Sequence, residues 1–284
     1  MAETLHFLSP AKINLRLEIL RKREDGYHEL RTIFQKISRF DTLHFSLTKE
    51  RGIFIRADNP SLPVGRRNLV YHAVRSVLEG AGYRGGVRVE IRKRIPLGAG
   101  LGGGSSNAAT AMKAVNLLLG TDLSPEALME MGVKIGADIP FFFLEGAAVG
   151  SGIGERLKKI ELPKLWLVLI YPNFEVSTRW AYENFILTKT GFHLNIHKLP
   201  KTPEGISRIL RNDLEAVVSN KYPQIEAMKK VLCSAGALGA LMTGSGPTVF
   251  GVFEDEASAL KAYKKVKDSI RPKGWAVFKA HSIP

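Results

Sequence analysis

Cysteine is almost absent from this chain of 284 residues, which contains one, Cys233. A single thiol cannot form a disulfide within the chain. The neighbours of Cys233 are apolar and helix-like, and free cysteine is among the most buried residue types. We therefore expect Cys233 to be a buried structural thiol rather than a nucleophile, in a protein of a reducing, cytoplasmic compartment.

Long hydrophobic runs are missing as well. The apolar stretches at 139–144 and 165–171 are far shorter than the roughly 20 residues that a membrane-spanning helix needs. The chain begins Met-Ala-Glu, without the basic and then apolar pattern of a signal peptide. We therefore expect no membrane partner.

Acidic residues are few compared with basic ones, since 27 Asp and Glu stand against 41 Lys and Arg and give a net charge of +14. Such a balance suits nucleic acid, a membrane surface or a phosphorylated small molecule, and it also occurs as a general surface bias. The basic residues form no low-complexity tail and are not interleaved with aromatics, as they are in nucleic-acid platforms. We expect a small phosphorylated ligand and no nucleic acid.

The segment 11–20 alternates between apolar and polar residues, which predicts a half-buried strand. Its polar face carries Lys12 and Asn14 side by side. A turn is predicted at 24–28. Further strands are expected at 43–47, 53–55 and 87–91. Helices are expected at 68–80 with Asn68 as the N-cap, from the glycines near 104 to Gly120, and at 124–136.

The second half of the chain starts near Glu155 and predicts the order strand, helix, strand, strand, helix, strand with additional helices. This order is typical of a two-layer α+β arrangement. The expected strands are 165–171, 239–242, 248–253 and 275–280, and the helical patterns are 178–187, 203–218, 222–234 and 254–270.

The stretch from Ile95 to Asn107 contains five glycines between a charged strand and a helix. A glycine loop that opens a helix directs unpaired N–H groups and the positive end of the helix dipole at one point. That point suits a phosphate. A plain strand-to-helix turn would not need so many glycines, because glycine weakens the elements it joins.

Two common phosphate loops fit this stretch poorly. Gly98, Gly100 and Gly103 match the dinucleotide fingerprint, and Asp122 lies about 20 residues later. A dinucleotide-binding strand is nearly continuous in apolar residues, however, and charged residues interrupt the strand at 87–94. The P-loop pattern requires Gly-Lys-Ser/Thr, where this chain has Gly-Ser-Ser.

Three segments resemble the GHMP kinases, the superfamily of galactokinase, homoserine kinase, mevalonate kinase and phosphomevalonate kinase. Residues 10–15 are similar to the first motif, 96–106 to the second and 242–248 to the third, in the family's order. The resemblance implies an α+β fold with an active site between two domains. These are an N-terminal ATP-binding domain, 1–154, like the second domain of ribosomal protein S5, and a ferredoxin-like C-terminal domain, 155–284.

Five segments resemble one branch of the superfamily, which acts on a cytidyl diphosphate substrate. They are 12–15, 25–30, 102–109, 136–142 and 212–215. The resemblance implies phosphorylation of a 2-hydroxyl of this substrate by ATP in the non-mevalonate route to isoprenoid precursors. Mg²⁺ is expected with ATP, and its protein ligands are left unassigned, since Ser105 or Ser106 could reach it.

By resemblance, Lys12 and Asp138 are the catalytic pair. Asp138 would accept the proton of the substrate hydroxyl, while Lys12 would neutralise developing charge and keep Asp138 ionised. From the residues alone, an exposed strand lysine and a turn aspartate would be the ordinary interpretation. The residues predicted to hold the ATP phosphates are Pro96, Leu97, Gly98, Ala99, Gly100, Leu101, Gly102, Gly103, Gly104, Ser105 and Ser106.

By resemblance, Tyr27 and His28 stack on and hydrogen-bond the cytosine, and Tyr182 is a second stacking aromatic. From its helical spacing, Tyr182 fits a core position equally well. The turn at 244–246 would close over the phosphates or the substrate diphosphate, although an ordinary hairpin also explains its glycines. The predicted substrate-binding residues are Asn14, Tyr27, His28, Thr178, Tyr182, Gly244 and Ser245.

Two alternatives remain open from the sequence. Within the superfamily, the substrate could be mevalonate or homoserine, although those kinases lack the Gly-Tyr-His turn at 26–28. Outside it, the chain could be a non-catalytic nucleic-acid-binding protein, because the family's N-terminal domain shares its fold with a ribosomal protein.

Overall fold

The computed structural model, which describes residues 4–187, 198–270 and 274–284, begins with two long strands. These are β1 (Thr4–Lys22) and β2 (His28–Thr48), joined by the predicted turn. The strand predicted at 43–47 is the end of the much longer β2. Among the described residues, no helix combines the length and the apolar character needed to cross a membrane.

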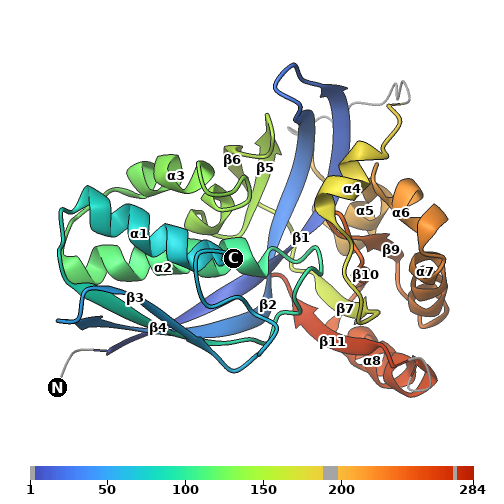
Figure 1. The fold of residues 1–284 in the computed structure, drawn as a ribbon. Helices are drawn as coiled ribbons and strands as arrows, with labels where there is room; N and C mark the ends of the chain where they lie inside the picture. Colours follow the sequence, from blue (N-terminus) through green and yellow to red (C-terminus); the bar gives the residue numbers. More distant parts are fainter. Residues whose placement is uncertain (1–3, 188–197, 271–273) are drawn as a thin grey trace. The chain divides into compact units, whose positions relative to one another are not determined.

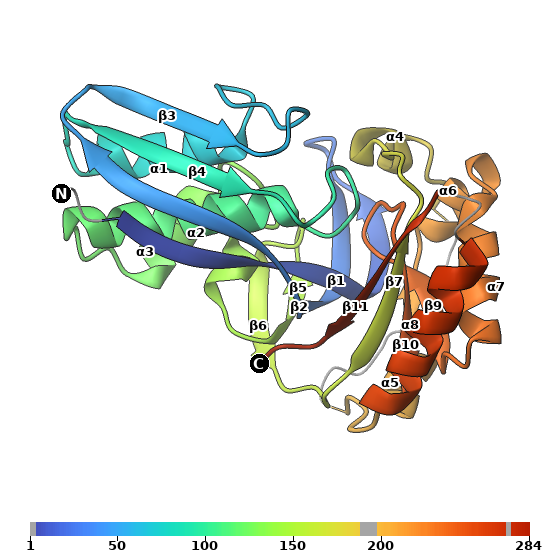
Figure 2. The same cartoon turned by 90° about the horizontal axis from the view of Figure 1, so that it is seen from below.

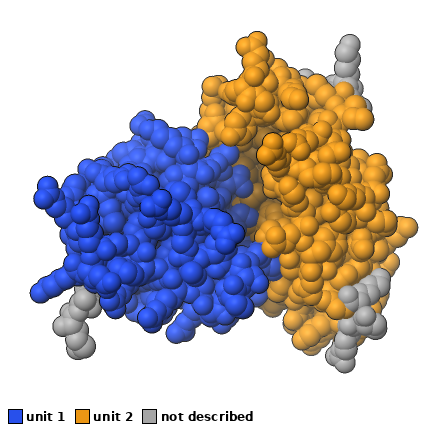
Figure 3. Space-filling view, viewed as in Figure 1, with its two compact units in different colours: residues 1–11, 39–97, 102–145 blue, residues 12–38, 98–101, 146–284 orange. Residues whose placement is uncertain are grey.

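The chain forms two compact units that interleave along the sequence (Figure 3). The first contains residues 1–11, 39–97 and 102–145, and the second contains 12–38, 98–101 and 146–284. The glycine-rich stretch contributes to both units, with 98–101 in the second and its remainder in the first. The units are therefore not two consecutive halves, and the division into sequence domains at 154 stays a prediction.

In the first unit, helices lie over one face of a small sheet (Figure 1). β4 pairs in parallel with β3 and antiparallel with the end of β2, and α1 and α2 lie side by side. The predicted cap of α1 is confirmed, because the Asn68 side chain accepts a 2.9 Å hydrogen bond from the Val70 N–H. The elements are β3 (Gly52–Ala57), α1 (Leu69–Gly80), β4 (Gly86–Arg92), α2 (Gly103–Leu119), α3 (Pro125–Val133) and the 3₁₀ helix η1 (Pro140–Phe143).

In the second unit, an antiparallel sheet has the strand order β11-β7-β10-β9. Helices α7 and α8 lie on one face of this sheet, as both views show (Figures 1 and 2). This order confirms the predicted ferredoxin-like α+β arrangement. The elements are β7 (Trp166–Tyr171), α7 (Gln224–Ser234), β9 (Gly239–Met242), β10 (Val249–Phe253), α8 (Glu256–Ile270) and β11 (Ala276–His281).

Among its described residues, the second unit also contains three strands that the sequence patterns did not predict, and three short helices that fall within or overlap the helical patterns predicted at 178–187 and 203–218. The start of β2 pairs with β5, which pairs with β6, and β1 pairs in parallel with the short strand β8. The helical pattern predicted at 203–218 is interrupted by β8 and is therefore wrong as one helix. These elements are β5 (Ala147–Ser151), β6 (Arg156–Ile160), α4 (Thr178–Glu183), α5 (Pro203–Arg208), β8 (Arg211–Asn212) and α6 (Glu215–Lys221).

Two burial predictions are wrong. Cys233 is exposed on α7, because it lies beside rather than on the buried stripe of Ile225, Met228 and Leu232. β1 is buried on both faces rather than one, since its polar residues Lys12, Asn14, Arg16 and Glu18 are as inaccessible as its apolar ones. Alternation predicts a strand's two faces but does not reveal that other elements cover both of them.

Candidate active site

The polar row of β1 forms a hydrogen-bonded chain in the second unit. Lys12 Nζ donates to Asn14 Oδ1 at 2.6 Å, and Asn14 Nδ2 donates to Thr32 Oγ1 at 2.7 Å. Lys12 and Asn14 are 4% and 1% exposed. Burial of an ammonium group is costly unless polar partners surround it, so this row is built to hold a positive charge at Lys12.

Residues 98–101 of the glycine loop pack against a second glycine-containing turn of the same unit, at 243–246. Lys12 N–H donates to Leu101 O at 2.9 Å, which fixes this loop beside β1. Gly100 has φ +74°, and a Cβ there would lie 2.3 Å from Thr243 O. Only glycine allows both this backbone conformation and this approach.

The turn after β9 is joined to β1 and to α4. Asn14 N–H donates to Thr243 Oγ1 at 2.9 Å, and a Cβ on Gly244 would lie 3.5 Å from Asn14 Oδ1. The Ser245 and Thr178 hydroxyls are 2.7 Å apart. The second unit therefore brings together six of the predicted residues: Lys12, Asn14, Gly100, Thr178, Gly244 and Ser245.

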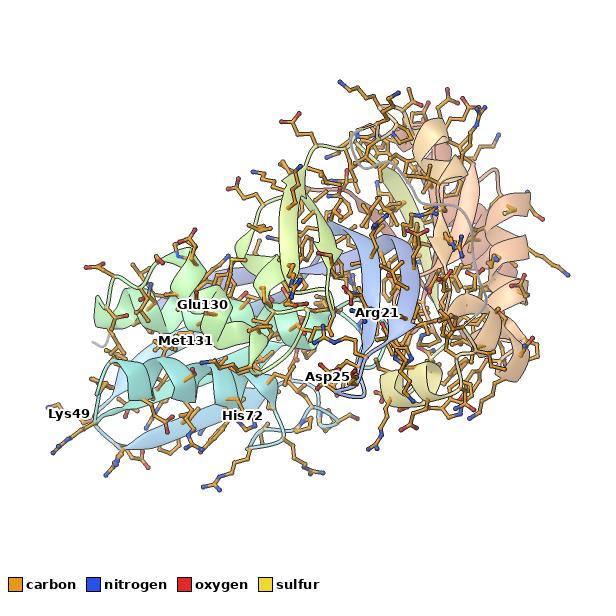
Figure 4. All side chains as sticks on the ribbon, turned by 90° about the horizontal axis from the view of Figure 1, so that it is seen from above. Arg21, Asp25, Lys49, His72, Glu130 and Met131 are labelled. Atoms are coloured by element: carbon orange, nitrogen blue, oxygen red, sulfur yellow. The ribbon has the colours of Figure 1, made fainter. Side chains whose placement is uncertain are left out.

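Two of the predicted aromatic residues stack on each other. The His28 and Tyr182 rings are 5.4 Å apart between centroids and 30° from parallel. Tyr182 also packs at the edge of the apolar core of this unit, which agrees with the core interpretation, while its role as a stacking aromatic stays a prediction. Tyr27 is 60% exposed, on the hairpin whose position Arg21 and Asp25 mark in Figure 4.

The surroundings of His28 favour its neutral form. Burial, with a smaller contribution from the positive charge of Lys22, lowers the pKa of His28 below its usual value of 6.5. A neutral imidazole can both donate and accept a hydrogen bond, as recognition of a base edge requires.

In the first unit, the remainder of the glycine stretch opens helix α2. Gly102 is the N-cap residue with φ +67°, and it has no side chain with which to cap the helix. The first N–H groups of α2 therefore have no capping side chain and point towards the position that an anion occupies at a helix N-terminus. Pro96 and Leu97 precede the loop in this same unit.

The two serines of the motif have different surroundings. Ser106 is fully buried, and its hydroxyl is 2.7 Å from that of Ser9. Ser105 is partly exposed, and its Oγ lies 4.0 Å from the position of a Cβ on Gly136. Of the two, Ser105 is the hydroxyl that faces the turn carrying Asp138.

Asp138 belongs to this turn in the first unit and is partly exposed. The turn is anchored on both sides, because Ile139 is fully buried and its N–H donates to Gly136 O at 3.1 Å. Lys12 belongs to the second unit.

A buried polar network under the loop was missed by the sequence patterns. Asp41 forms an ion pair with Lys93, and its Oδ1 accepts hydrogen bonds from Arg94 N–H (2.7 Å) and Ile95 N–H (2.9 Å). Asn107 donates to Asp41 at 3.0 Å. The network joins the strand before the loop to the helix after it, over sequence separations that no local pattern reports.

No cluster of three or more His, Cys, Asp or Glu suited to a metal ion occurs among residues 4–187, 198–270 and 274–284. A metal ion held only by protein side chains therefore has no preformed cage in the described chain. Mg²⁺ does not need one, since it commonly keeps several waters and binds through substrate phosphates and one or two protein oxygens.

Comparison with known proteins gives a consistent family. Residues 68–146 match the GHMP kinases N terminal domain and 195–271 match GHMP kinases C terminal. The 4-diphosphocytidyl-2-C-methyl-D-erythritol kinase of Syntrophus aciditrophicus is 48% identical over 98% of this chain and 99% of its own length.

Solved structures agree with this result. A crystal structure of 4-(cytidine 5'-diphospho)-2C-methyl-D-erythritol kinase has a TM-score of 0.83 and 33% identity, and covers 99% of this chain and 100% of its own. Homoserine kinase from Cytophaga hutchinsonii, with a TM-score of 0.76, shares the fold at 22% identity and covers 99% of this chain and 95% of its own.

Proposed function

This chain belongs to the 4-diphosphocytidyl-2-C-methyl-D-erythritol kinases, a family of GHMP kinases, and we propose that it transfers the γ-phosphate of ATP to the 2-hydroxyl of that substrate. The reaction places the enzyme in the non-mevalonate route to isoprenoid precursors. The observation that carries the proposal for the site is the buried Lys12 ammonium, held by Asn14 next to two glycine turns.

Lys12 and Asp138 carry the chemistry in this proposal. The oxygen of the 2-hydroxyl attacks the γ-phosphorus, the bond from that phosphorus to the β–γ bridging oxygen breaks, and ADP leaves with the electron pair. Asp138 takes the hydroxyl proton, and Lys12 stabilises the negative charge spread over the transferred group. Phosphoryl transfer depends mainly on such positioning and charge neutralisation.

The glycine loop from Pro96 to Ser106 holds the phosphates of ATP. Glycines at 98, 100 and 102 have positive φ, which lets successive backbone N–H groups turn towards one anion. Ser105 is the protein oxygen best placed to reach Mg²⁺, because the Ser106 hydroxyl is already bonded to Ser9. When bound with ATP, Mg²⁺ neutralises phosphate charge.

The acceptor site consists of the residues that the second unit gathers around β1. His28 and Tyr182 offer ring faces on which a cytosine stacks, and Tyr27 offers a third ring on the same hairpin. Asn14, Thr178 and Ser245 offer polar groups beside them, and the Gly244 turn offers backbone amides. Stacking contributes about 1–3 kcal/mol per base in comparable sites.

The proposal extends to the setting of the enzyme. A cytoplasmic location fits a chain with one cysteine, whose partner is a small phosphorylated molecule rather than nucleic acid or a membrane surface. The high net positive charge would then attract ATP and the diphosphate substrate.

The experiment is a coupled assay for ADP release with three alcohols: the cytidyl diphosphate substrate, mevalonate and homoserine. Turnover with the first alone is expected, and phosphorus NMR of the product should show a new phosphomonoester on the 2-hydroxyl. Turnover with mevalonate or homoserine alone would reject the proposal. Salt-sensitive RNA binding without ATP turnover would support a nucleic-acid-binding protein instead.

A further inference from the structure

The segment Asn212-Asp213-Leu214-Glu215, called here the 212–215 motif, runs from the last residue of β8 to the first residue of α6 and takes no part in the proposed chemistry. β8 pairs in parallel with β1 at Arg16 and Leu17, a short distance along the strand from Asn14. We propose that Asn212, Asp213 and Glu215 are positioning residues, which hold the turn 243–246 against β1 and so set the affinity for the cytidyl diphosphate substrate. The inference rests on the proposed function.

Asn212 holds both sides of the turn with one amide group. Its Nδ2 donates to Met242 O at 2.7 Å and to Gly244 O at 2.8 Å, and its Oδ1 accepts from Leu214 N–H at 3.0 Å. The side chain is buried, with one partner for each amide N–H and one for the oxygen. Without the Asn212 amide, the carbonyl groups of Met242 and Gly244 would each lose a hydrogen bond.

The fixed carbonyl of Gly244 has a consequence for the next residue. In a trans peptide, the C=O and the following N–H point in opposite directions. Because Asn212 holds Gly244 O, the N–H of Ser245 points to the opposite side of the turn, away from Asn212. The Asn212 side chain therefore determines where the Ser245 N–H is presented to a ligand.

Asp213 bonds to strand β1, and Glu215 bonds to strand β9. Asp213 Oδ2 accepts from Ile19 N–H at 2.8 Å, and Asp213 N–H donates to Leu17 O at 3.0 Å, which fixes the motif to β1. Glu215 Oε2 accepts from Met242 N–H at 2.7 Å, at the end of β9.

These bonds close a ring of contacts. β1 is joined to the motif through Asp213, the motif is joined to the turn through Asn212 and Glu215, and the turn returns to β1 through Thr243, whose Oγ1 accepts from Asn14 N–H at 2.9 Å. Asn14 is also the partner of Lys12. A shift of the motif would therefore move the turn relative to the residues that meet the substrate.

The motif also borders a cavity of about 1140 Å³ in the second unit, lined by Asn212, Asp213 and Glu215 among others. Asn220 on α6 lines the same cavity and is exposed. A change at Asn220 alters the same cavity without touching the turn, so Asn220→Ala is a matched control.

The test compares variants that keep or remove single bonds. Asn212→Asp keeps the acceptor for Leu214 N–H but replaces the donor to Met242 O and Gly244 O with an oxygen. Glu215→Ala removes the acceptor for Met242 N–H, whereas Glu215→Gln keeps an oxygen there. KM for the cytidyl diphosphate substrate, KM for ATP, kcat and melting temperature are measured for each.

We expect Asn212→Asp, Asn212→Ala and Glu215→Ala to raise KM for the cytidyl diphosphate substrate about tenfold, which corresponds to the loss of one or two hydrogen bonds. KM for ATP should change less than threefold, roughly, since the loop that holds ATP stays bonded to β1 through Lys12 N–H and Leu101 O when the turn shifts. Asn220→Ala should resemble the parent. Glu215→Gln should fall between the parent and Glu215→Ala, because it keeps an oxygen for Met242 N–H but loses the charge that pairs with Lys229.

Parental KM values in all the variants, with only the melting temperature lowered, would overturn the inference, because a purely structural motif affects how much enzyme folds and not its affinity. Equal rises in both KM values would also overturn it. If the parent itself shows no turnover with the cytidyl diphosphate substrate, the proposed function fails and this inference fails with it.

Discussion

Lys12 Nζ donates a 2.6 Å hydrogen bond to Asn14 Oδ1 within a strand that is buried on both faces. Residues two apart on a strand share one face, so the amide oxygen of Asn14 is presented to the ammonium group by the strand geometry itself. The amide nitrogen of Asn14 donates a hydrogen bond to Thr32 Oγ1, which prevents the amide from turning its nitrogen towards Lys12. The position of the charge is thus fixed before any ligand binds.

The first prediction concerns this charge. Lys12→Ala should reduce kcat about 100-fold or more, because the transferred phosphoryl group loses a positioned positive charge. Steady-state kinetics with the cytidyl diphosphate substrate measure the loss, and circular dichroism checks the fold. Lys49→Ala, at an exposed lysine marked in Figure 4, is the control and should retain parental turnover. Near-parental turnover of a folded Lys12→Ala enzyme would contradict the assignment.

The second prediction concerns the proton acceptor. Asp138→Asn should reduce kcat about 100-fold or more, while substrate binding measured by calorimetry changes little, because an amide of the same size cannot take the hydroxyl proton. Asp268→Asn, at an exposed aspartate on α8, serves as the control. A variant that loses affinity but keeps kcat would place Asp138 in binding rather than in proton transfer.

The third prediction separates backbone strain from close contact. Gly82 and Gly100 both have positive φ, but a Cβ on Gly82 meets nothing within 4 Å, whereas one on Gly100 would lie 2.3 Å from Thr243 O. Gly82→Ala should destabilise the protein by about 1–2 kcal/mol through strain alone. Gly100→Ala should cost more and should also lower kcat/KM, because the loop and the turn are forced apart.

Chemical denaturation measures both free energies of unfolding in this comparison, and kinetics measure the turnover of each variant. If Gly82→Ala and Gly100→Ala lose the same stability and both keep parental kcat/KM, the close contact between Gly100 and Thr243 O has no effect of its own and the prediction is wrong. Gly65→Ala, where φ is not positive and no atom lies within 4 Å of the added Cβ, supplies the baseline.

The fourth prediction concerns pH. The pKa of His28 is lowered by burial and by Lys22, so below the usual value of 6.5 the unfolded chain binds a proton at this position more readily than the native protein does. Stability should therefore fall as the pH drops below about 6.5, and the contribution of His28 is fully present above it.

Melting temperatures at pH 5 and pH 8 test this prediction. The difference between the two should be smaller in His28→Gln than in the parent. His44, whose pKa is also lowered by burial, should account for part of the remainder, so the double variant should show a smaller difference still. An unchanged difference in His28→Gln would contradict the prediction.

Much of the fold followed from local pattern. The Asn68 cap, the glycine after α2 and the order of strands and helices along the second half of the chain were predicted because caps, glycines and apolar periodicity act over a few residues. The site could be predicted only from the family resemblance, since the residues alone left Lys12 and Asp138 as ordinary surface charges. The burial of Lys12 is the property that distinguishes it, and periodicity does not report burial.

The contacts that the sequence could not predict join distant residues. Asn212 reaches the turn at 242–244 across 30 residues, and Asp41 reaches the strand before the glycine loop across more than 50. The interleaving of the two units has the same origin, because it depends on which distant segments pack together. The motif at 212–215 was visible as a resemblance, but its hydrogen-bonded partners were not.

The exposure of Cys233 has a practical consequence for experiments. It is the only cysteine in the chain, and it lies on α7, which packs against β10, the strand that follows the turn 243–246. A maleimide dye will therefore attach at one defined position without any engineering of the sequence. In ordinary buffers the same thiol will link pairs of molecules by slow air oxidation, so preparations need a reductant even though the folded protein has no disulfide of its own.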